Sequence, residues 1–400
     1  MSELRAVAAL SLGFGLVGID RFLITTLYPV IAADLHLDYR DIGIITGALA
    51  IAWGIAALLM GNISDRIGRP RVLVSSMVAF SLLIGANGLA TGLFTLIAVR
   101  IVMGVADGAY TPASIAATLG ASMPGRRGLN IGIQQTMMPL FGLGLAPLFV
   151  AFALRFVEWR LIFLTFLLPG LALAYALSKV VSAPTGRDTS FRRHSLSDWQ
   201  FVLGFANVRI AALMMLCWLT CLITTSAFMP NYMIDYLHVP PRQMGVAMSA
   251  IGLGATAGTL TLPWLSDKIG RKGVMIIASS GVFTALLLLA RASQDGGQLF
   301  GCLFGVHFFN NALIALTVGP LCFEAVPPSL TATASGLVIA VGELFGGGVA
   351  PMVVGHVAKR FGIEHILSLP IAMMALGILL CFGLQDRRLH PPTVSSEAFS

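Results

Sequence analysis

The chain has 400 residues, of which 57% are hydrophobic and only 11% are charged, and its formal net charge is +7. A soluble domain carries roughly 25% charged residues. This composition, with a mean hydropathy of +0.88, therefore excludes an ordinary soluble protein and predicts an integral membrane protein. The five cysteines all lie in apolar stretches without metal-ligand spacing or a disulfide framework. We expect no metal site and no cofactor.

Hydrophobic runs of about 20 residues, long enough to cross a bilayer as a helix, recur twelve times. The predicted spans are 6–31, 42–62, 71–91, 94–120, 128–152 and 159–180, and then 206–234, 243–265, 273–292, 297–322, 331–355 and 364–384. We predict an all-α membrane protein. Its expected parts are an N-terminal six-helix half (1–181), a polar and basic linker (182–204), a C-terminal six-helix half (205–386) and a tail (387–400).

The basic residues are divided unevenly between the two ends of the predicted spans. Fifteen Lys and Arg residues lie at the end that carries both termini and the linker, and seven lie at the opposite end, where Lys359 and Arg360 run against the trend. Cytoplasmic loops carry an excess of Lys and Arg, so both termini are predicted to be cytoplasmic in a cytoplasmic (inner) membrane. Because these charges flank the spans, we expect the lipid bilayer as a partner and no nucleic acid.

A short segment between spans 2 and 3 recurs between spans 8 and 9. The first copy contains Ser64-Asp65-Arg66-Ile67-Gly68-Arg69 and the second Ser266-Asp267-Lys268-Ile269-Gly270-Arg271, half a chain later. Two unrelated basic loops do not readily explain this shared string. Two parallel repeats of six spans are a known arrangement in secondary transporters. The repeat predicts a transporter with two similar halves.

These two loops resemble the signature loop of the major facilitator superfamily, and the resemblance covers essentially the whole chain. It implies the fold of that superfamily, with twelve transmembrane helices in two pseudo-symmetric halves, and we expect a functional monomer. In the superfamily, charge pairs of this loop hold the halves together on the cytoplasmic side when the transporter opens outward. The resemblance implies a gating role for Asp65, Arg66, Arg69, Asp267 and Arg271.

Several ionisable residues lie deep within the predicted spans. They are Asp20, Arg21, Arg100, Asp107, His307 and Glu343. A charge at membrane depth costs at least a few kcal/mol, so these groups mark either a functional site or a structural network of ion pairs. Arg keeps its proton, whereas a desolvated carboxylate can gain one. Arg100 and Asp107 are seven residues apart and therefore project from one helix face, so spans 1 and 4 can offer two Arg and two carboxylates to one cavity.

The Asp20-Arg21 pair, and Arg100 with an acid seven residues later, resemble the anion:cation symporter branch of the superfamily. Tyr232 also matches a Pro-x-Tyr at the outer end of span 7, and Trp53 stands where the branch has a substrate-holding Tyr. The resemblance implies that Arg21, Arg100, Trp53 and Tyr232 bind the substrate and that Asp20 and Asp107 carry protons.

Glu343 departs from that branch and is either a third proton-coupling site or a cation contact. Its own half's spans hold no basic partner for Glu343 other than His307 or Arg209. A lone His in an apolar span is more often a satisfied interhelical hydrogen bond than a titrating site. The hydroxyls of Thr224, Thr225 and Ser226 either line the cavity or bond to their own backbone.

We therefore predict a secondary active transporter that couples symport of protons to import of a small organic anion, a carboxylate. Because the Trp53 indole lacks a phenol group, this anion is expected to be more apolar than a sugar acid. The alternative is a proton-driven efflux antiporter for amphipathic compounds, whose Gly-Pro signature Gly142–Pro147 matches only in part. A receptor of this fold would carry a longer cytoplasmic domain. An enzyme is not expected, because the sequence shows no nucleophile–base pair or phosphate loop.

Overall fold

The structure is a computed structural model that describes residues 3–181, 196–327 and 330–385, without the side chains of 59–67, 69, 124, 196–198 and 332. Its first part contains α1 (Glu3–Leu35), α2 (Tyr39–Ile67), α3 (Arg69–Asn87), α4 (Leu93–Ala121), η1 (Pro124–Arg126), α5 (Arg127–Pro139), η2 (Leu140–Leu145), α6 (Ala146–Ala153), α7 (Trp159–Thr165) and α8 (Leu167–Val180).

The second part begins with α9 (Leu196–Leu203), which falls within the predicted linker. It continues with α10 (Ala206–Asn231), η3 (Tyr232–Tyr236), α11 (Pro241–Ile269), α12 (Arg271–Leu289), α13 (Gly296–Leu316), η4 (Thr317–Leu321), α14 (Cys322–Ala325), α15 (Thr331–Val341), η6 (Gly342–Val349), α16 (Ala350–Phe361), η7 (Ile363–His365) and α17 (Ser368–Phe382). Segments η2, η3, η4 and η6 are π-helical turns that interrupt long spans.

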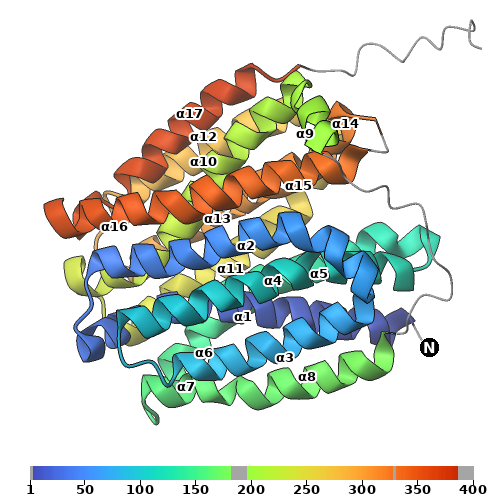
Figure 1. Ribbon diagram of the computed structural model, residues 1–400. Coiled ribbons are helices and arrows are strands. Elements are labelled where there is room, and N and C mark those ends of the chain that lie inside the picture. Colours follow the sequence, from blue (N-terminus) through green and yellow to red (C-terminus); the bar gives the residue numbers. More distant parts are fainter. Residues whose placement is uncertain (1–2, 182–195, 328–329, 386–400) are drawn as a thin grey trace, which may run out of the picture.

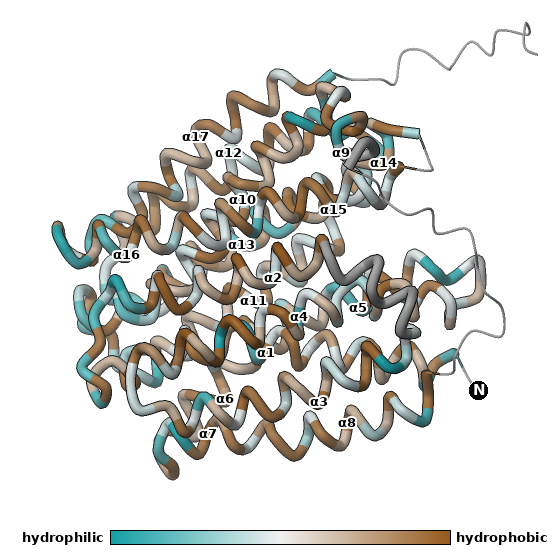
Figure 2. Tube along the Cα trace, viewed as in Figure 1, coloured by the Kyte–Doolittle hydropathy of each residue, from teal (hydrophilic) through white to brown (hydrophobic). Residues whose placement is uncertain are grey.

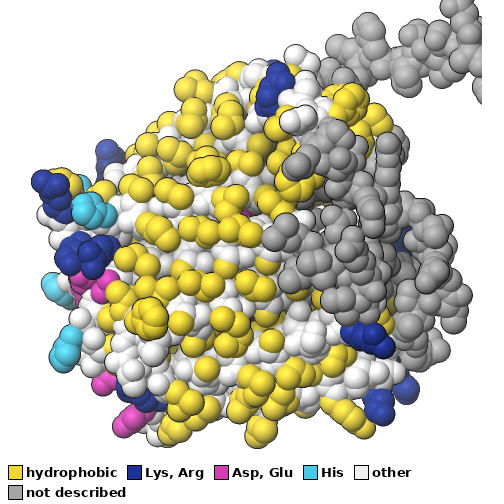
Figure 3. Space-filling model, in the orientation of Figure 1, with side chains coloured by type: hydrophobic (Ala, Val, Ile, Leu, Met, Phe, Trp, Pro, Cys, Tyr) yellow, Lys and Arg dark blue, Asp and Glu magenta, His cyan; other side chains and the backbone are white. Residues whose placement is uncertain are grey.

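Twelve helical segments in the described ranges are long and apolar enough to cross a membrane, as the hydrophobic runs predict. Apolar residues dominate the middle of the helices, and polar residues gather toward their ends (Figure 2). On the face shown in Figure 3, hydrophobic side chains cover the centre, and most of the charged side chains lie at the two ends. This all-α architecture of twelve spans confirms the predicted fold class.

We call spans 1–6 (α1 to α8) the N-terminal half and spans 7–12 (α10 to α17) the C-terminal half. The two halves lie side by side (Figure 1) and meet along two seams, where α2 packs against η6 and α16, and α11 packs against η2 and α6. The contact of α1 with α10 lies between them. The exact division of the chain at 182–204 remains a proposal, since residues 182–195 lie outside the described ranges.

Glycines bring the two halves close together at both seams. A Cβ atom on Gly252 of α11 would overlap the backbone of Gly144 in η2, and one on Gly47 of α2 would lie 2.6 Å from the Gly348 carbonyl oxygen in η6. Only a residue without a side chain permits backbones to approach this closely. The seams therefore depend on backbone contact between spans 5 and 8 and between spans 2 and 11.

Polar contacts join the halves at the predicted outer end. The Lys359 ammonium forms an ion pair with Asp38, and the Tyr39 hydroxyl donates to the Asp235 carboxylate at 3.0 Å. Each pair takes one residue from each half, near the loops that follow α1, η3 and α16. These contacts and the two seams hold the halves together at that end of the bundle.

Candidate functional site

The central feature of the site is an ion pair between the two halves. Arg21 lies midway along α1, and Glu343 lies in the π-helical turn η6 of span 11. The Arg21 guanidinium donates from Nη1 to Oε1 of Glu343 at 3.0 Å and from Nη2 to Oε2 at 2.7 Å. Both side chains are buried. This bidentate geometry is the strongest form of an Arg–carboxylate contact.

The partner of Glu343 comes from the opposite half, and it is neither His307 nor Arg209. His307 instead hydrogen-bonds the Thr225 hydroxyl at 3.1 Å, and Arg209 donates to the carbonyl oxygens of Leu203 and Gly204. The physical reason is packing, since the glycine-rich turn η6 lies directly against α2 and α10 and so brings Glu343 to the interface. Among the described residues, the Glu343 carboxylate thus contacts a cation, the Arg21 guanidinium.

Aromatic rings flank the same guanidinium. The Trp53 ring of α2 lies 4.4 Å from the Arg21 Cζ atom, and the Phe22 ring lies at 5.7 Å. A guanidinium over an aromatic face gains a cation–π interaction that is stronger when desolvated. The structure therefore places Trp53 beside Arg21, as the prediction of a shared site requires.

A second buried cluster lies next to this pair. Arg100 of α4 donates from Nη1 to the backbone carbonyl of Asp20 at 2.8 Å, and its Nε and Nη2 groups have no hydrogen-bond partner in the described part of the chain. The carboxyl groups of Asp20 and Asp107 are neighbours, and no described donor bonds to any of their four oxygens. Two ionised carboxylates only accept hydrogen bonds, so these two can bond to each other only when one is protonated.

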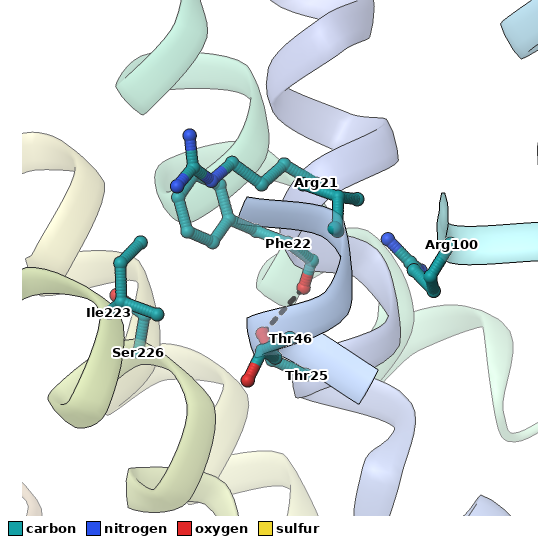
Figure 4. Close-up of a pocket in the computed structure, with 8 residues that line it drawn as sticks. Arg21, Phe22, Thr25, Thr46, Arg100, Ile223 and Ser226 are labelled. Atoms are coloured by element: carbon teal, nitrogen blue, oxygen red, sulfur yellow. Dashed lines mark hydrogen bonds between the residues drawn. The ribbon is translucent and has the colours of Figure 1, made fainter. Parts of the chain in front are cut away.

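Residues of three helices of the N-terminal half and one of the C-terminal half line a small cavity beside Arg21 (Figure 4). The lining residues are Arg21, Phe22, Thr25, Thr46, Leu49, Arg100, Ile223 and Ser226. Its free volume is about 10 Å³, which is room for roughly one water molecule. The site is therefore nearly closed in this conformation.

Of the predicted substrate-binding residues, the structure brings Arg21, Trp53 and Arg100 together but not Tyr232. Tyr232 lines a separate open crevice with Tyr236 and Arg291, and its ring packs 5.2 Å from that of Tyr236. Of the predicted proton carriers, Asp20 and Asp107 are neighbours, and Glu343 lies across the interface on Arg21. The substrate-binding role of Tyr232 stays a prediction, because Tyr232 does not share a cavity with Arg21 and Arg100.

The predicted gating residues are described only in the second loop. Arg271 pairs with Asp267 at 2.6 Å and with Glu324 at 3.1 Å, all in the C-terminal half. The side chains of Asp65, Arg66 and Arg69 lie outside the described residues. A gating role for the two loops therefore remains a proposal.

Comparison with known proteins identifies the family. Residues 10–351 match the family model described as Major Facilitator Superfamily. The chain belongs to this superfamily. The predicted family is thereby confirmed, and the protein is a multi-pass membrane transporter and not an enzyme.

Relatives with known names are transporters of small molecules. The 3-(3-hydroxy-phenyl)propionate transporter of Escherichia coli is 26% identical, over 90% of this chain and 88% of that protein. The sialic acid transporter NanX of Escherichia coli is also 26% identical, over 94% of this chain and 93% of that protein. The fold is similar to that of a bacterial homologue of the lysosomal transporter Spinster in an inward-facing, occupied conformation, with a TM-score of 0.80, 16% identity, and coverage of 94% of this chain and 95% of that one.

Two parts of this transporter's site were not predicted from the sequence. The first is the contact of Arg21 with Glu343, which are 322 residues apart. The second is the set of apolar lining residues Phe22, Leu49 and Ile223. One sequence signal marks both seams, because Phe-Gly-x-Gly-x-Ala-Pro occurs at 141–147 in span 5 and again at 345–351 in span 11.

Proposed function

We propose that this protein moves a small organic carboxylate together with a proton by alternating access. The observation that carries the proposal is the bidentate contact of Arg21 with Glu343. The guanidinium already holds a carboxylate, and that carboxylate belongs to the opposite half. Glu343 thus occupies the position that a substrate carboxylate would take on Arg21.

Competition for Arg21 couples the substrate to a proton. A substrate carboxylate that displaces Glu343 leaves this acid buried without its cation, which is costly until the acid binds a proton. One carboxylate and one proton then enter the site together. The same exchange breaks an ion pair between the halves, so the loaded transporter is free to reorient, while the empty, unprotonated transporter stays latched.

The charges of the buried cluster support the same stoichiometry. Three acids, Asp20, Asp107 and Glu343, face two permanent cations, Arg21 and Arg100. One proton shared by the neighbouring Asp20 and Asp107 makes the cluster neutral. A monocarboxylate then requires one further proton if a nearly closed, low-dielectric site is to stay neutral. Transport of a monocarboxylate with one proton moves no net charge across the membrane.

The lining of the cavity supports an anion with an apolar body. Phe22, Leu49 and Ile223 contribute aromatic and aliphatic surface to the lining, and the Trp53 ring lies 4.4 Å from the Arg21 Cζ atom. Two relatives are named as transporters of 3-(3-hydroxy-phenyl)propionate and of niacin/nicotinamide, and these names agree with such a substrate. On the basis of the Lys and Arg distribution, we further propose that both termini lie on the cytoplasmic side of a cytoplasmic (inner) membrane. From the resemblance to the superfamily, we propose a functional monomer.

The test is uptake by proteoliposomes across a panel of aliphatic, aromatic and sugar acids under an imposed pH gradient. A proton symporter accumulates a carboxylate when the side that receives it is alkaline. The alternative, a proton-driven exporter, shows the opposite dependence on the direction of the gradient. Uptake that ignores the pH gradient, or the absence of carboxylate uptake across the panel, would contradict the proposed function.

A further inference from the structure

Ser226 of α10 differs from Thr25 and Thr46, the other hydroxyl residues that line the cavity. Thr25 donates to the Phe22 carbonyl at 2.7 Å, and Thr46 donates to the Ile42 carbonyl at 2.8 Å. The neighbouring Thr225 also donates to a carbonyl of its own helix, that of Cys221, at 2.6 Å. Such bonds to the preceding turn are the usual way in which a helical Ser or Thr satisfies its hydroxyl.

The Ser226 hydroxyl makes no such bond. Its side chain is only 1% exposed, and Oγ has no hydrogen-bond partner among the described residues. It lines the same cavity as Arg21 and Arg100, across from the α1 residues (Figure 4). A buried hydroxyl without a partner is unfavourable, so this hydroxyl is available to a molecule that enters the cavity.

We propose that Ser226 is a specificity-determining residue that binds an uncharged polar group, a hydroxyl or a carbonyl, on the carboxylate held by Arg21. This inference rests on the proposed function and narrows its substrate to monocarboxylates with a second, neutral hydrogen-bonding group. The lining residues that α10 contributes, Ile223 and Ser226, carry no charge, so this side of the cavity offers no cation to a second carboxylate. A second carboxylate would also add a charge that the two arginines do not balance.

Such a substrate would bridge the two halves. Its carboxylate binds Arg21 of the N-terminal half, and its neutral group binds Ser226 of the C-terminal half. The substrate thus exchanges the ion pair between Arg21 and Glu343 for a weaker, neutral hydrogen bond to the C-terminal half, so the loaded transporter is still freer to reorient than the empty one. If the site closes only around a substrate that has both the carboxylate and the neutral polar group, it rejects an analogue that lacks one of them. The protein group that would bind the missing one is then left buried and unpaired.

The test compares matched acids that differ by one hydroxyl, in proteoliposomes of the full chain. The pairs are 3-phenylpropionate with its 2-, 3- and 4-hydroxyphenyl analogues, and butyrate with 3-hydroxybutyrate. We expect at least one hydroxylated member to be taken up about tenfold more efficiently than its parent, the effect of one hydrogen bond. Ser226→Ala should remove this preference, so that the hydroxylated acid and its parent are taken up equally well.

The control is Ser249→Ala in α11, because Ser249 is equally buried but its hydroxyl already donates to the Val246 carbonyl at 2.7 Å. This variant should keep the preference. A preference that survives in Ser226→Ala, or no preference in the unaltered protein, would overturn the inference while leaving carboxylate transport intact. If no acid of any pair is taken up, the proposed function itself fails.

Discussion

Spans 5 and 11 hold equivalent positions in the two halves, and they share a backbone motif but not their chemistry. Phe141–Pro147 and Phe345–Pro351 both read Phe-Gly-x-Gly-x-Ala-Pro, and both overlap a π-helical turn. Three residues before the first glycine of the motif, span 5 has Pro139 and span 11 has Glu343. The shared part of each span contacts the opposite half, and the part that differs provides the acid that meets Arg21.

The glycine contacts between the halves follow the internal symmetry of the molecule, whereas the buried charged cluster does not. The second glycine of each motif, Gly144 or Gly348, lies against a glycine of the other half, Gly252 or Gly47. In the proposed alternating-access cycle both seams close and open together, which agrees with the likeness of their contacts. The charged cluster does not follow the symmetry, because four of its members come from α1 and α4 and one comes from η6. Neither half therefore contains a complete site.

The largest expected effect comes from breaking the seams. We expect Gly252→Ala and Gly47→Ala to shift the population away from the conformation closed at the predicted outer end, since each added Cβ meets backbone of the other half. Overpacking costs about 1–3 kcal/mol, a shift of roughly five- to hundredfold. Distances between spin labels at the outer ends of α2 and α16 report it. Gly301→Ala, where a Cβ meets nothing within 4 Å, is the control, and unchanged distances in the seam variants would refute the role of the seams.

The next effect concerns the cation of the asymmetric cluster. Arg21→Lys should insert and fold but lose about ten- to hundredfold in uptake, because an ammonium cannot reproduce two parallel hydrogen bonds to a carboxylate. The apparent affinity for the carboxylate is the quantity to measure. Arg209→Lys, which alters an exposed Arg outside the cavity, should leave uptake near its normal value. Near-normal affinity in Arg21→Lys would exclude Arg21 from substrate binding.

Glu343→Gln tests whether span 11 supplies the coupled proton. The amide imitates a permanently protonated acid, so we expect exchange of substrate across the membrane to persist while uphill accumulation under a pH gradient is lost. Counterflow and gradient-driven uptake on the same purified variant distinguish these activities. If Glu343 is only a structural partner, its loss leaves Arg21 buried and unpaired at a cost of about 3–5 kcal/mol, and exchange and thermal stability should then fail together.

Asp107→Asn is the companion experiment, because the neighbouring Asp20 and Asp107 are the other acids proposed to hold a proton. If they only keep the cluster neutral, this variant retains gradient-driven accumulation. Loss of accumulation in Asp107→Asn, with accumulation retained in Glu343→Gln, would move the coupled proton from span 11 to spans 1 and 4.

The smallest effect is expected at the polar contacts of the outer end. Partial burial disfavours the charge of Asp38, but the hydrogen bond and charge of Lys359, together with the backbone N–H groups of Arg40 and Asp41, outweigh it and lower the pKa of this carboxyl from its ordinary 3.8. A lowered pKa means that the pair is fully formed above that value and is lost only as the pH falls below it. Asp38→Asn should change uptake by at most about fivefold, as for an exposed ion pair. The pH profile between about pH 5 and 8 should keep its shape, and a displaced profile would show that this pair takes part in coupling.

The sequence by itself determined the twelve spans, the helical class and the family. These properties are local, because each span is defined by its own apolar length and the repeated Ser-Asp-basic-Ile-Gly-Arg string is contiguous. The cost of charge in a membrane also singled out Asp20, Arg21, Arg100, Asp107 and Glu343 without any structure. The sequence showed that these groups need partners.

Only the tertiary structure decided who those partners are. Glu343 reaches Arg21 instead of His307 or Arg209, since the glycines of η6 bring span 11 against α2 of the other half. Tyr232 lies in a crevice apart from the cavity, and Ser226 lines the cavity with a hydroxyl that bonds to no described residue of its own helix. Helical periodicity gives the face of a side chain within its span. The rotation and depth of one span against another depend on how all the spans pack together, and no stretch of sequence contains that information alone.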